Sequence, residues 1–91
     1  MTKNSNTHTI ALREAILAGQ PVTRLDSIAI FGVSDLMGLI SDMRREGFLI
    51  KSRRIGFREA VQQAQKYILY EPPKALHVDE LTITQYWFEP L

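Results

Sequence analysis

Apolar residues recur at helical spacing through the first half of the chain. The apolar residues of the first segment that share one helix face are Leu12, Ala15 and Ile16. We expect this helix to begin near Thr7 or Thr9, either of which can cap it, and to end at Gly19. The polar residues 1–6 are expected to form a flexible N-terminus.

A second helix is predicted after the turn at residues 20–22. Thr23 can cap it, and Asp26 stands three residues later as a shortened capping box. The residues expected on its buried side are Leu25, Ile28 and Ala29.

The segment Phe31-Gly32-Val33-Ser34 predicts a very short turn between two helices. Gly32 can adopt the left-handed conformation that stops one helix, and Ser34 can cap the next, so we expect a third helix over residues 34–46 that closes at Gly47. Its predicted core residues are Leu36, Leu39, Ile40 and Met43. Its opposite face carries Ser34, Gly38, Ser41, Asp42 and Arg45.

Beyond Gly47 the pattern changes to extended structure. Residues 48–55 and 66–70 have the composition of two strands, which together predict a β-hairpin. The ten residues between them, GFREAVQQAQ, exceed a tight turn and are compatible with either a short helix or a long mobile tip.

The C-terminal residues form a separate β-prone segment. Pro72 and Pro73 end the second strand because proline cannot donate a ladder hydrogen bond. Residues 81–88 have strong strand propensity and little charge, a composition that would promote aggregation on an exposed edge, so we expect them to be buried. They either pack back on the domain as an extra strand or are buried against a second copy; we favour the second, with a dimer interface at Tyr86, Trp87 and Phe88.

The elements predict one domain, mainly α with a small β-hairpin: a winged helix-turn-helix of three helices plus a wing. Its expected organisation is a flexible N-terminus at 1–6, the winged helix-turn-helix domain at 7–71 and the C-terminal extension at 72–91. An overall composition of 45% hydrophobic and 23% charged residues is that of an ordinary globular protein.

Charge is distributed unevenly along the chain. The net charge is +1, but residues 44–66 contain seven basic and two acidic residues, so this block carries +5 and the remainder carries −4. A local basic block of this kind is typical of a surface that binds a polyanion.

Enzymatic and cofactor chemistry find little support. Without cysteine there is no disulfide, thiolate ligand or thiol nucleophile, and His8 and His77 are isolated from other metal ligands. Nucleophile elbows and phosphate-binding glycine loops are also missing, so we expect no catalytic residues, metal or cofactor. No stretch is apolar enough for a membrane span or signal peptide, and we expect a cytoplasmic protein.

The run from Gly19 to Ile50 resembles the compact helix-turn-helix domains of phage and bacterial mobile-element proteins. In those domains a Thr-capped helix precedes Phe-Gly-Val-Ser, followed by a helix ending in Ile-x-x-Leu-Arg-x-x-Gly and a wing opened by an aromatic residue and an isoleucine. The matching positions are Thr23, Phe31, Gly32, Val33, Ser34, Leu36, Ile40, Met43, Arg44, Gly47, Phe48 and Ile50. The resemblance implies a small, DNA-associated cytoplasmic protein, although the scaffold also serves protein contacts.

A DNA-binding surface would combine the third helix with the basic wing. The predicted contacts are Arg24, Ser34, Gly38, Ser41, Arg44, Arg45, Lys51, Arg53, Arg54 and Arg58. Asp35 and Asp42 weaken direct base reading because phosphates repel carboxylates.

We therefore expect a DNA-binding transcriptional regulator or architectural factor of phage or mobile-element origin, acting on double-stranded DNA as a homodimer. The alternative is a phage-encoded winged-helix inhibitor, such as an anti-CRISPR or other anti-defence protein, that contacts a host nucleic-acid enzyme. RNA binding ranks third because no aromatic-studded sheet is visible.

Overall fold

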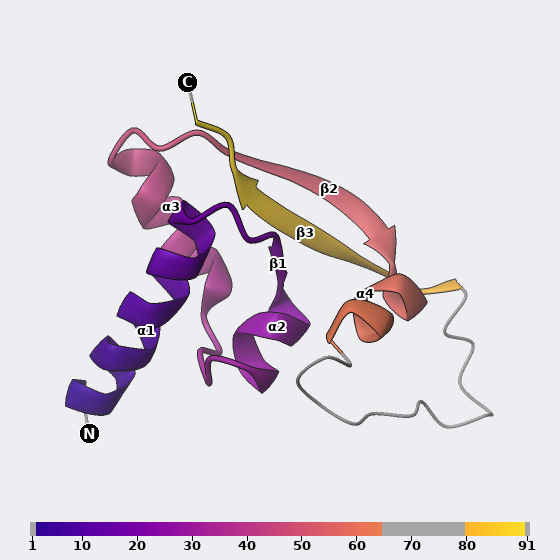
Figure 1. Cartoon of the computed structure of the whole chain (residues 1–91), viewed down its shortest axis with the longest axis horizontal. Coiled ribbons are helices and arrows are strands. Elements are labelled where there is room, and N and C mark those ends of the chain that lie inside the picture. The colour runs from indigo at the N-terminus through magenta and orange to yellow at the C-terminus, as the bar shows by residue number, and fades with distance from the viewer. Residues whose placement is uncertain (1, 65–79, 91) are drawn as a thin grey trace.

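Short strands and helices are interspersed along the chain in a computed structural model, which describes residues 2–64 and 80–90 (Figure 1). The elements in these residues are α1 (Thr2–Leu17), β1 (Val22–Thr23), α2 (Arg24–Ala29), α3 (Leu36–Arg45), β2 (Ile50–Gly56), α4 (Phe57–Ala64) and β3 (Thr82–Phe88). They form a compact α/β domain with a three-stranded antiparallel sheet, where the sequence predicted a mainly α domain with a hairpin.

The sheet differs from the expected hairpin because β3 is its central strand, in the order β1-β3-β2. Val22 and Thr23 of β1 pair with Tyr86 and Gln85, and β2 pairs with β3 over its whole length, from Ile50 opposite Phe88 to Gly56 opposite Thr82. We favoured burial of residues 81–88 against a second copy, but the segment packs back on its own domain as the central strand β3. The predicted strand at 66–70 lies outside the described residues.

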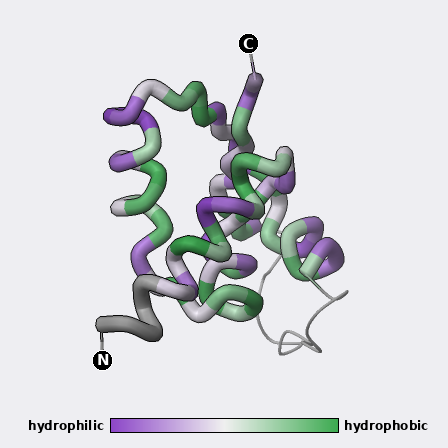
Figure 2. Tube along the Cα trace, turned by 60° about the vertical axis from the view of Figure 1, so that its left-hand side comes forward, coloured by the Kyte–Doolittle hydropathy of each residue, from purple (hydrophilic) through white to green (hydrophobic). Residues whose placement is uncertain are grey.

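The main core lies between α1, α3 and one face of the sheet. Its buried members are Leu12, Ile16, Val22, Val33, Leu36, Leu39, Ile40, Met43, Ile50 and Tyr86. All four apolar positions predicted for the inner face of α3 are among them, which confirms the spacing argument for this helix. Figure 2 shows apolar and polar positions alternating along the helices that surround this core.

Two predictions for the first helices were wrong. The first helix begins at Thr2, not near Thr7 or Thr9, so it includes residues 2–6 that were assigned to a flexible N-terminus. The buried residues of α2 are Asp26 and Ser27, whereas Ile28 is 51% exposed. A helix of six residues has too few turns for apolar spacing to define a face, and hydrogen bonds at its ends set its orientation instead.

Residues 57–64 form the helix α4. Of the two alternatives that the sequence left open here, a short helix or a long mobile tip, the structure has the helix. Its buried residues Ala60, Val61 and Ala64 lie on one face, and α4 contacts α2, β2 and β3 (Figure 1). The amide of Phe57 donates to the carbonyl of Leu81 at 2.9 Å, which links the start of α4 to the start of β3. None of the helices within residues 2–64 has the length and apolar character that a bilayer crossing requires.

Candidate nucleic-acid interface

Local hydrogen bonds build the turn between α2 and α3. The Thr23 hydroxyl accepts from the Asp26 amide, and the Asp26 carboxylate accepts from the Thr23 amide at 2.9 Å, which confirms the predicted capping box. Gly32 has a φ of +68°, a conformation that other residues rarely adopt. The Ser27 hydroxyl donates to the Val33 carbonyl, and the Val33 amide donates to the Ser27 carbonyl at 2.9 Å. The turn is therefore fixed to α2, and α3 leaves it in a defined direction.

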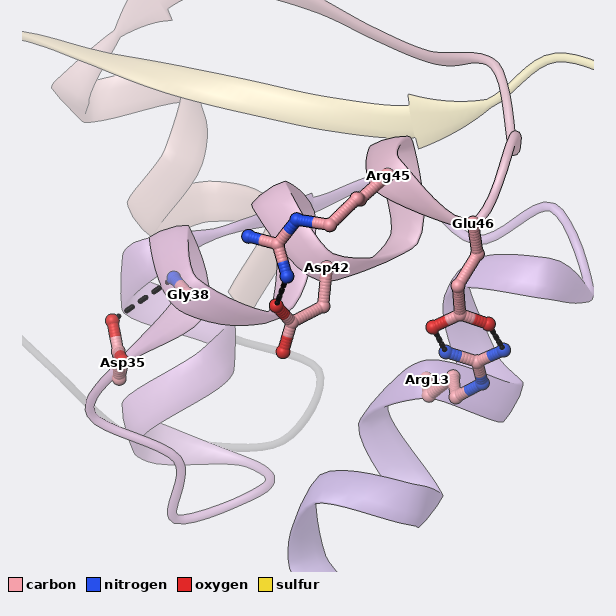
Figure 3. Close-up of polar contacts among 6 residues, drawn as sticks. All are labelled: Arg13, Asp35, Gly38, Asp42, Arg45 and Glu46. Carbon is pink, nitrogen blue, oxygen red and sulfur yellow. Dashed lines mark hydrogen bonds and ion pairs between the residues drawn. The ribbon is translucent and has the colours of Figure 1, made fainter.

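Asp35, rather than Ser34, caps α3. Its carboxylate accepts from the amide of Gly38 at 3.0 Å, and the helix runs over Leu36–Arg45 instead of 34–46 (Figure 3). A Cβ atom on residue 38 would overlap with Oδ2 of Asp35. Gly38 therefore provides room for the capping carboxylate, which is a different role from the DNA contact predicted for it.

The outward side of α3 is largely the one predicted. Ser34, Ser41, Asp42 and Arg45 are exposed, and Gly38 is half-buried. Arg45 donates through Nη1 to Oδ1 of Asp42 at 3.0 Å, with both side chains pointing away from the core (Figure 3). This exposed pair lowers the net positive charge that α3 presents to a polyanion, although exposed pairs of this type are weak and exchange readily with other partners.

Arg44 connects α3 to the sheet. Its guanidinium donates from Nε and Nη2 to the carbonyl of Ile50, at 3.1 and 2.7 Å, and lies 5.9 Å from the ring centre of Tyr86. Met37, two turns earlier, accepts a hydrogen bond from the Tyr86 hydroxyl, with 2.8 Å between Oη and Sδ. Arg44 thus holds α3 in place against β2 and β3, a role that the sequence did not suggest.

The basic residues of β2 lie on both faces of the sheet. Side chains alternate along a strand, and residues directly opposite each other share a face. Arg54 pairs with Thr84, two positions from the pair of Ser52 with Tyr86, so it lies on the face that α3 packs against. Its guanidinium donates to the hydroxyl of Thr82, with Nε 3.1 Å from Oγ1.

Lys51 and Arg53 lie on the opposite face of the sheet. Lys51 pairs with Trp87, and its Nζ is 3.9 Å from a Glu89 carboxylate oxygen. Arg53 pairs with Gln85 and donates to its side-chain oxygen at 3.4 Å, while the Gln85 amide donates to Gln63 of α4 at 3.0 Å. These two residues therefore do not join the surface formed by α3 and Arg54.

Arg24 and Arg58 complete the predicted set. Arg24 is the exposed first residue of α2, and Arg58, which was assigned to the basic wing, belongs to the first turn of α4. Helices α2 and α4 contact each other. The ten predicted contacts are accordingly divided between the α3 side of the molecule, the opposite face of the sheet and the helices α2 and α4.

An ion pair fixes the end of α3 to α1. Arg13 donates through Nη1 and Nη2 to the two carboxylate oxygens of Glu46, at 2.9 and 2.6 Å (Figure 3). These hydrogen bonds lower the pKa of Glu46 below its ordinary value and raise that of Arg13. The Arg13 guanidinium also lies 5.3 Å from the ring centre of Phe48, which places it between α1 and the segment that follows α3.

The predicted dimer residues have different environments. Tyr86 is 8% exposed and belongs to the main core, whereas Trp87 and Phe88 are half-buried. Phe88 packs edge-on against Phe48, with 5.7 Å between ring centres, and the Trp87 indole donates to Glu89 at 3.0 Å. The homodimer itself stays a prediction.

The roles of two residues at α3 were not predicted from the sequence. Asp35 caps the helix, and Met37 is exposed on its outward side. Asp is as good a cap as Ser, and the glycine three residues after Asp35 was a signal that favoured it. Met37 gave no such signal, because its contact with Tyr86 joins residues 49 positions apart in the sequence.

The described residues also include a groove of about 380 Å³ between α1 and the α2–α3 turn. Its lining residues are Thr7, His8, Ala11, Ile28, Ala29, Ile30, Phe31 and Gly32. Among the described residues there is no cluster of three or more His, Asp or Glu side chains able to hold a metal ion, and His77 lies outside them.

Comparison of the chain with protein-family models, with curated proteins and with solved structures found no match. Its function is therefore argued from the contacts and charges of the described residues.

Proposed function

We propose that this protein is a winged helix-turn-helix protein that binds double-stranded DNA, with the outward side of α3 in the major groove. The element order supports this proposal: a helix, a short strand, two helices joined by a short turn, and then two antiparallel strands, β2 and β3, with α4 between them in the sequence. An α-helix with its side chains is about 10–12 Å across, and the major groove is about 12 Å wide. The role that fits is that of a transcriptional regulator or architectural factor.

The observation that carries the proposal is the continuous surface made by α3 and the inner face of β2 and β3. Met37 and Arg44 both contact Tyr86, which places the outward side of α3 beside the sheet residues Ser52 and Arg54. Arg45 at the end of α3 and Arg54 on the sheet are both exposed and would supply positive charge at two separate places. Such an arrangement suits contact with phosphates on the two sides of a groove.

The surface differs from the one expected from sequence. Arg45 and Arg54 are the proposed phosphate contacts, with Ser34 and Ser41 near base edges. Arg44 is a positioning residue because Nε and Nη2 of its guanidinium donate to the Ile50 carbonyl. Lys51 and Arg53 face away from this surface, which makes them suitable controls.

The test compares two adjacent arginines on opposite faces of β2. We expect Arg54→Ala to weaken binding to a short duplex of random sequence and to lower the slope of log K against log salt by about 0.9, the value for one phosphate contact. Arg53→Ala should leave the slope unchanged. Fluorescence anisotropy at several salt concentrations measures both quantities. Failure of the wild-type protein to bind at low salt would contradict the proposed DNA binding. Equal effects of the two variants would contradict the proposed orientation, in which Arg54 and not Arg53 faces the DNA.

A protein partner is the second candidate, favoured by the acidic groups on α3. Asp42 is exposed and lies beside Arg45, and Asp35 is exposed at the start of the helix. Both carboxylates disfavour the approach of phosphate, whereas a protein surface can offer donors to them. In this case the protein would act as an inhibitor of a host nucleic-acid enzyme. A partner that remains bound in a pull-down after nuclease treatment would support this function.

A further inference from the structure

Met37 is an exposed apolar side chain in the middle of the proposed DNA-binding surface. It is 51% exposed, whereas the other large apolar residues of α3, at positions 36, 39, 40 and 43, are all buried. The other large apolar residues that are exposed in the described part of the chain, Ile10, Ile28, Leu49 and Leu81, lie outside α3. Met37 therefore adds apolar surface to a helix whose remaining outward side chains are small or charged.

The side chain of Met37 is held in place by the sheet. The Tyr86 hydroxyl donates to its sulfur at 2.8 Å, and the Tyr86 ring is anchored in the core at 8% exposure. Methionine ordinarily has several accessible rotamers, and a hydrogen bond to the sulfur reduces this freedom. The thioether is thus positioned before any ligand arrives, so less conformational entropy is lost on binding.

The neighbours of Met37 on the helix surface carry no charge. Ser34 and Ser41 stand three residues before and four residues after it, which makes them its nearest neighbours on the outward side. Small hydroxyl side chains allow the helix to approach a groove floor closely. The part of α3 nearest to the base edges would then be apolar in its centre and weakly polar around it.

We propose that Met37 makes α3 prefer thymine at the contacted position, by packing against the C5-methyl group in the major groove. The proposal rests on the proposed DNA-binding function and names the feature of DNA that the helix reads. The thymine methyl group is the one apolar group that an unmodified base pair presents in the major groove. A neutral, apolar and preorganised side chain fits this group, whereas the charged residues near the C-terminal end of α3, Asp42 and Arg45, fit donors and phosphates.

The test uses thymine-to-uracil replacement, which removes the methyl group and leaves the base pairing unchanged. A duplex selected by the wild-type protein from a random pool is prepared once with thymine and once with uracil. We expect the uracil duplex to bind about fourfold more weakly for each contacted thymine, the value for burial of one methyl-sized group. Fluorescence anisotropy at fixed salt measures both affinities.

Two variants of similar size separate the apolar contact from a change in structure. Met37→Leu keeps an apolar side chain and should retain a preference for thymine. Met37→Gln should bind both duplexes equally, and its melting curve checks that it remains folded. Retention of the full preference by Met37→Gln overturns the inference.

The outcomes also distinguish this inference from the proposed function. Equal binding of the wild type to both duplexes overturns the role of Met37 and leaves DNA binding in place. Failure of the wild type to bind any duplex at low salt removes both.

Discussion

At the scale of single residues, the start of α3 depends on a close fit between Asp35 and Gly38. The capping carboxylate occupies the space where residue 38 would carry a Cβ atom. Glycine inside a helix is ordinarily unfavourable by about 1 kcal/mol relative to alanine. At this position the cost is offset by the cap that the glycine permits.

The first prediction concerns this cap. Asp35→Ala should lower the free energy of unfolding by about 1 kcal/mol, because it removes the acceptor for the Gly38 amide. Ser34→Ala, at the cap position predicted from sequence, should change it by less than about 0.5 kcal/mol. Urea unfolding followed by circular dichroism measures both variants. A larger loss for Ser34→Ala than for Asp35→Ala would contradict the assignment of the cap.

Gly38→Ala is a second test of the contact between residue 38 and the Asp35 carboxylate. In the wild-type background we expect no stabilisation, since the new methyl group displaces the Asp35 carboxylate. In the Asp35→Ala background the same change should stabilise the helix by about 1 kcal/mol, the ordinary difference between the two residues. Additive effects of the two substitutions in this double-mutant cycle would show that the two side chains do not interact.

At the scale of elements, the sequence predicts best where a helix has enough turns to define a face. Helix α3 has ten residues, and all of its predicted core positions are buried. Helix α2 has six, and its buried residues Asp26 and Ser27 are polar, so apolar spacing gave the wrong face. The capping box at Thr23 was nevertheless predictable, because it depends on only four consecutive residues.

In the candidate site, too, some features were predictable from the local sequence and others were not. Exposure of Ser34, Ser41 and Arg45 followed from helical spacing. The separation of Arg53 from Arg54 on opposite faces required knowledge of the strand register, which is set by residues about 30 positions away in the sequence. Composition alone places all the basic residues in one block and cannot assign them to faces.

The ion pair between α1 and the end of α3 leads to a pH-dependent prediction. The pKa of Glu46 is lowered from its ordinary value of 4.5 by the hydrogen bonds from Arg13, so the pair stabilises the fold above pH 4.5. This contribution is lost as the pH falls through the lowered pKa, where Glu46 becomes protonated in the folded state as well. We expect wild type to exceed Glu46→Gln in urea midpoint at neutral pH, and the difference to disappear well below pH 4.5.

Glu59→Gln serves as the control for general effects of charge, since Glu59 is an exposed acid on α4 with its carboxylate near Gln63. A difference between wild type and Glu46→Gln that persists unchanged in acid would exclude the ion pair as its cause. High salt at neutral pH should reduce the difference, because both side chains are partly exposed to solvent.

At the scale of the whole molecule, the sheet depends on a strand that comes from the C-terminal end of the sequence. Residues 81–88 were predicted to have strand propensity but were assigned to an extension at 72–91. Propensity is a local property, whereas the partners of a strand are decided by which apolar faces fit together across the fold. The structure places Thr82–Phe88 between β1 and β2 as the strand that joins the described sheet.

Removal of β3 should therefore abolish the fold. A chain ending at residue 80 loses every pairing of the described sheet, since β1 and β2 both pair with β3 and neither pairs with the other. It also loses Tyr86 from the core and exposes Val22 and Ile50, which are 0% and 4% exposed in the intact domain. Domains have a net stability of about 5–15 kcal/mol, which the combined loss of a central strand and a core aromatic residue exceeds.

Circular dichroism and amide dispersion in proton NMR spectra measure the outcome, with a chain ending at Glu89 as the control that retains all of β3. We expect the control to unfold cooperatively and the chain ending at residue 80 to show no cooperative transition. A chain of residues 1–80 that folds as a stable monomer would mean that residues 7–71 hold together without β3. In that event the C-terminal segment would be available for contact with a second copy, as the sequence predicted.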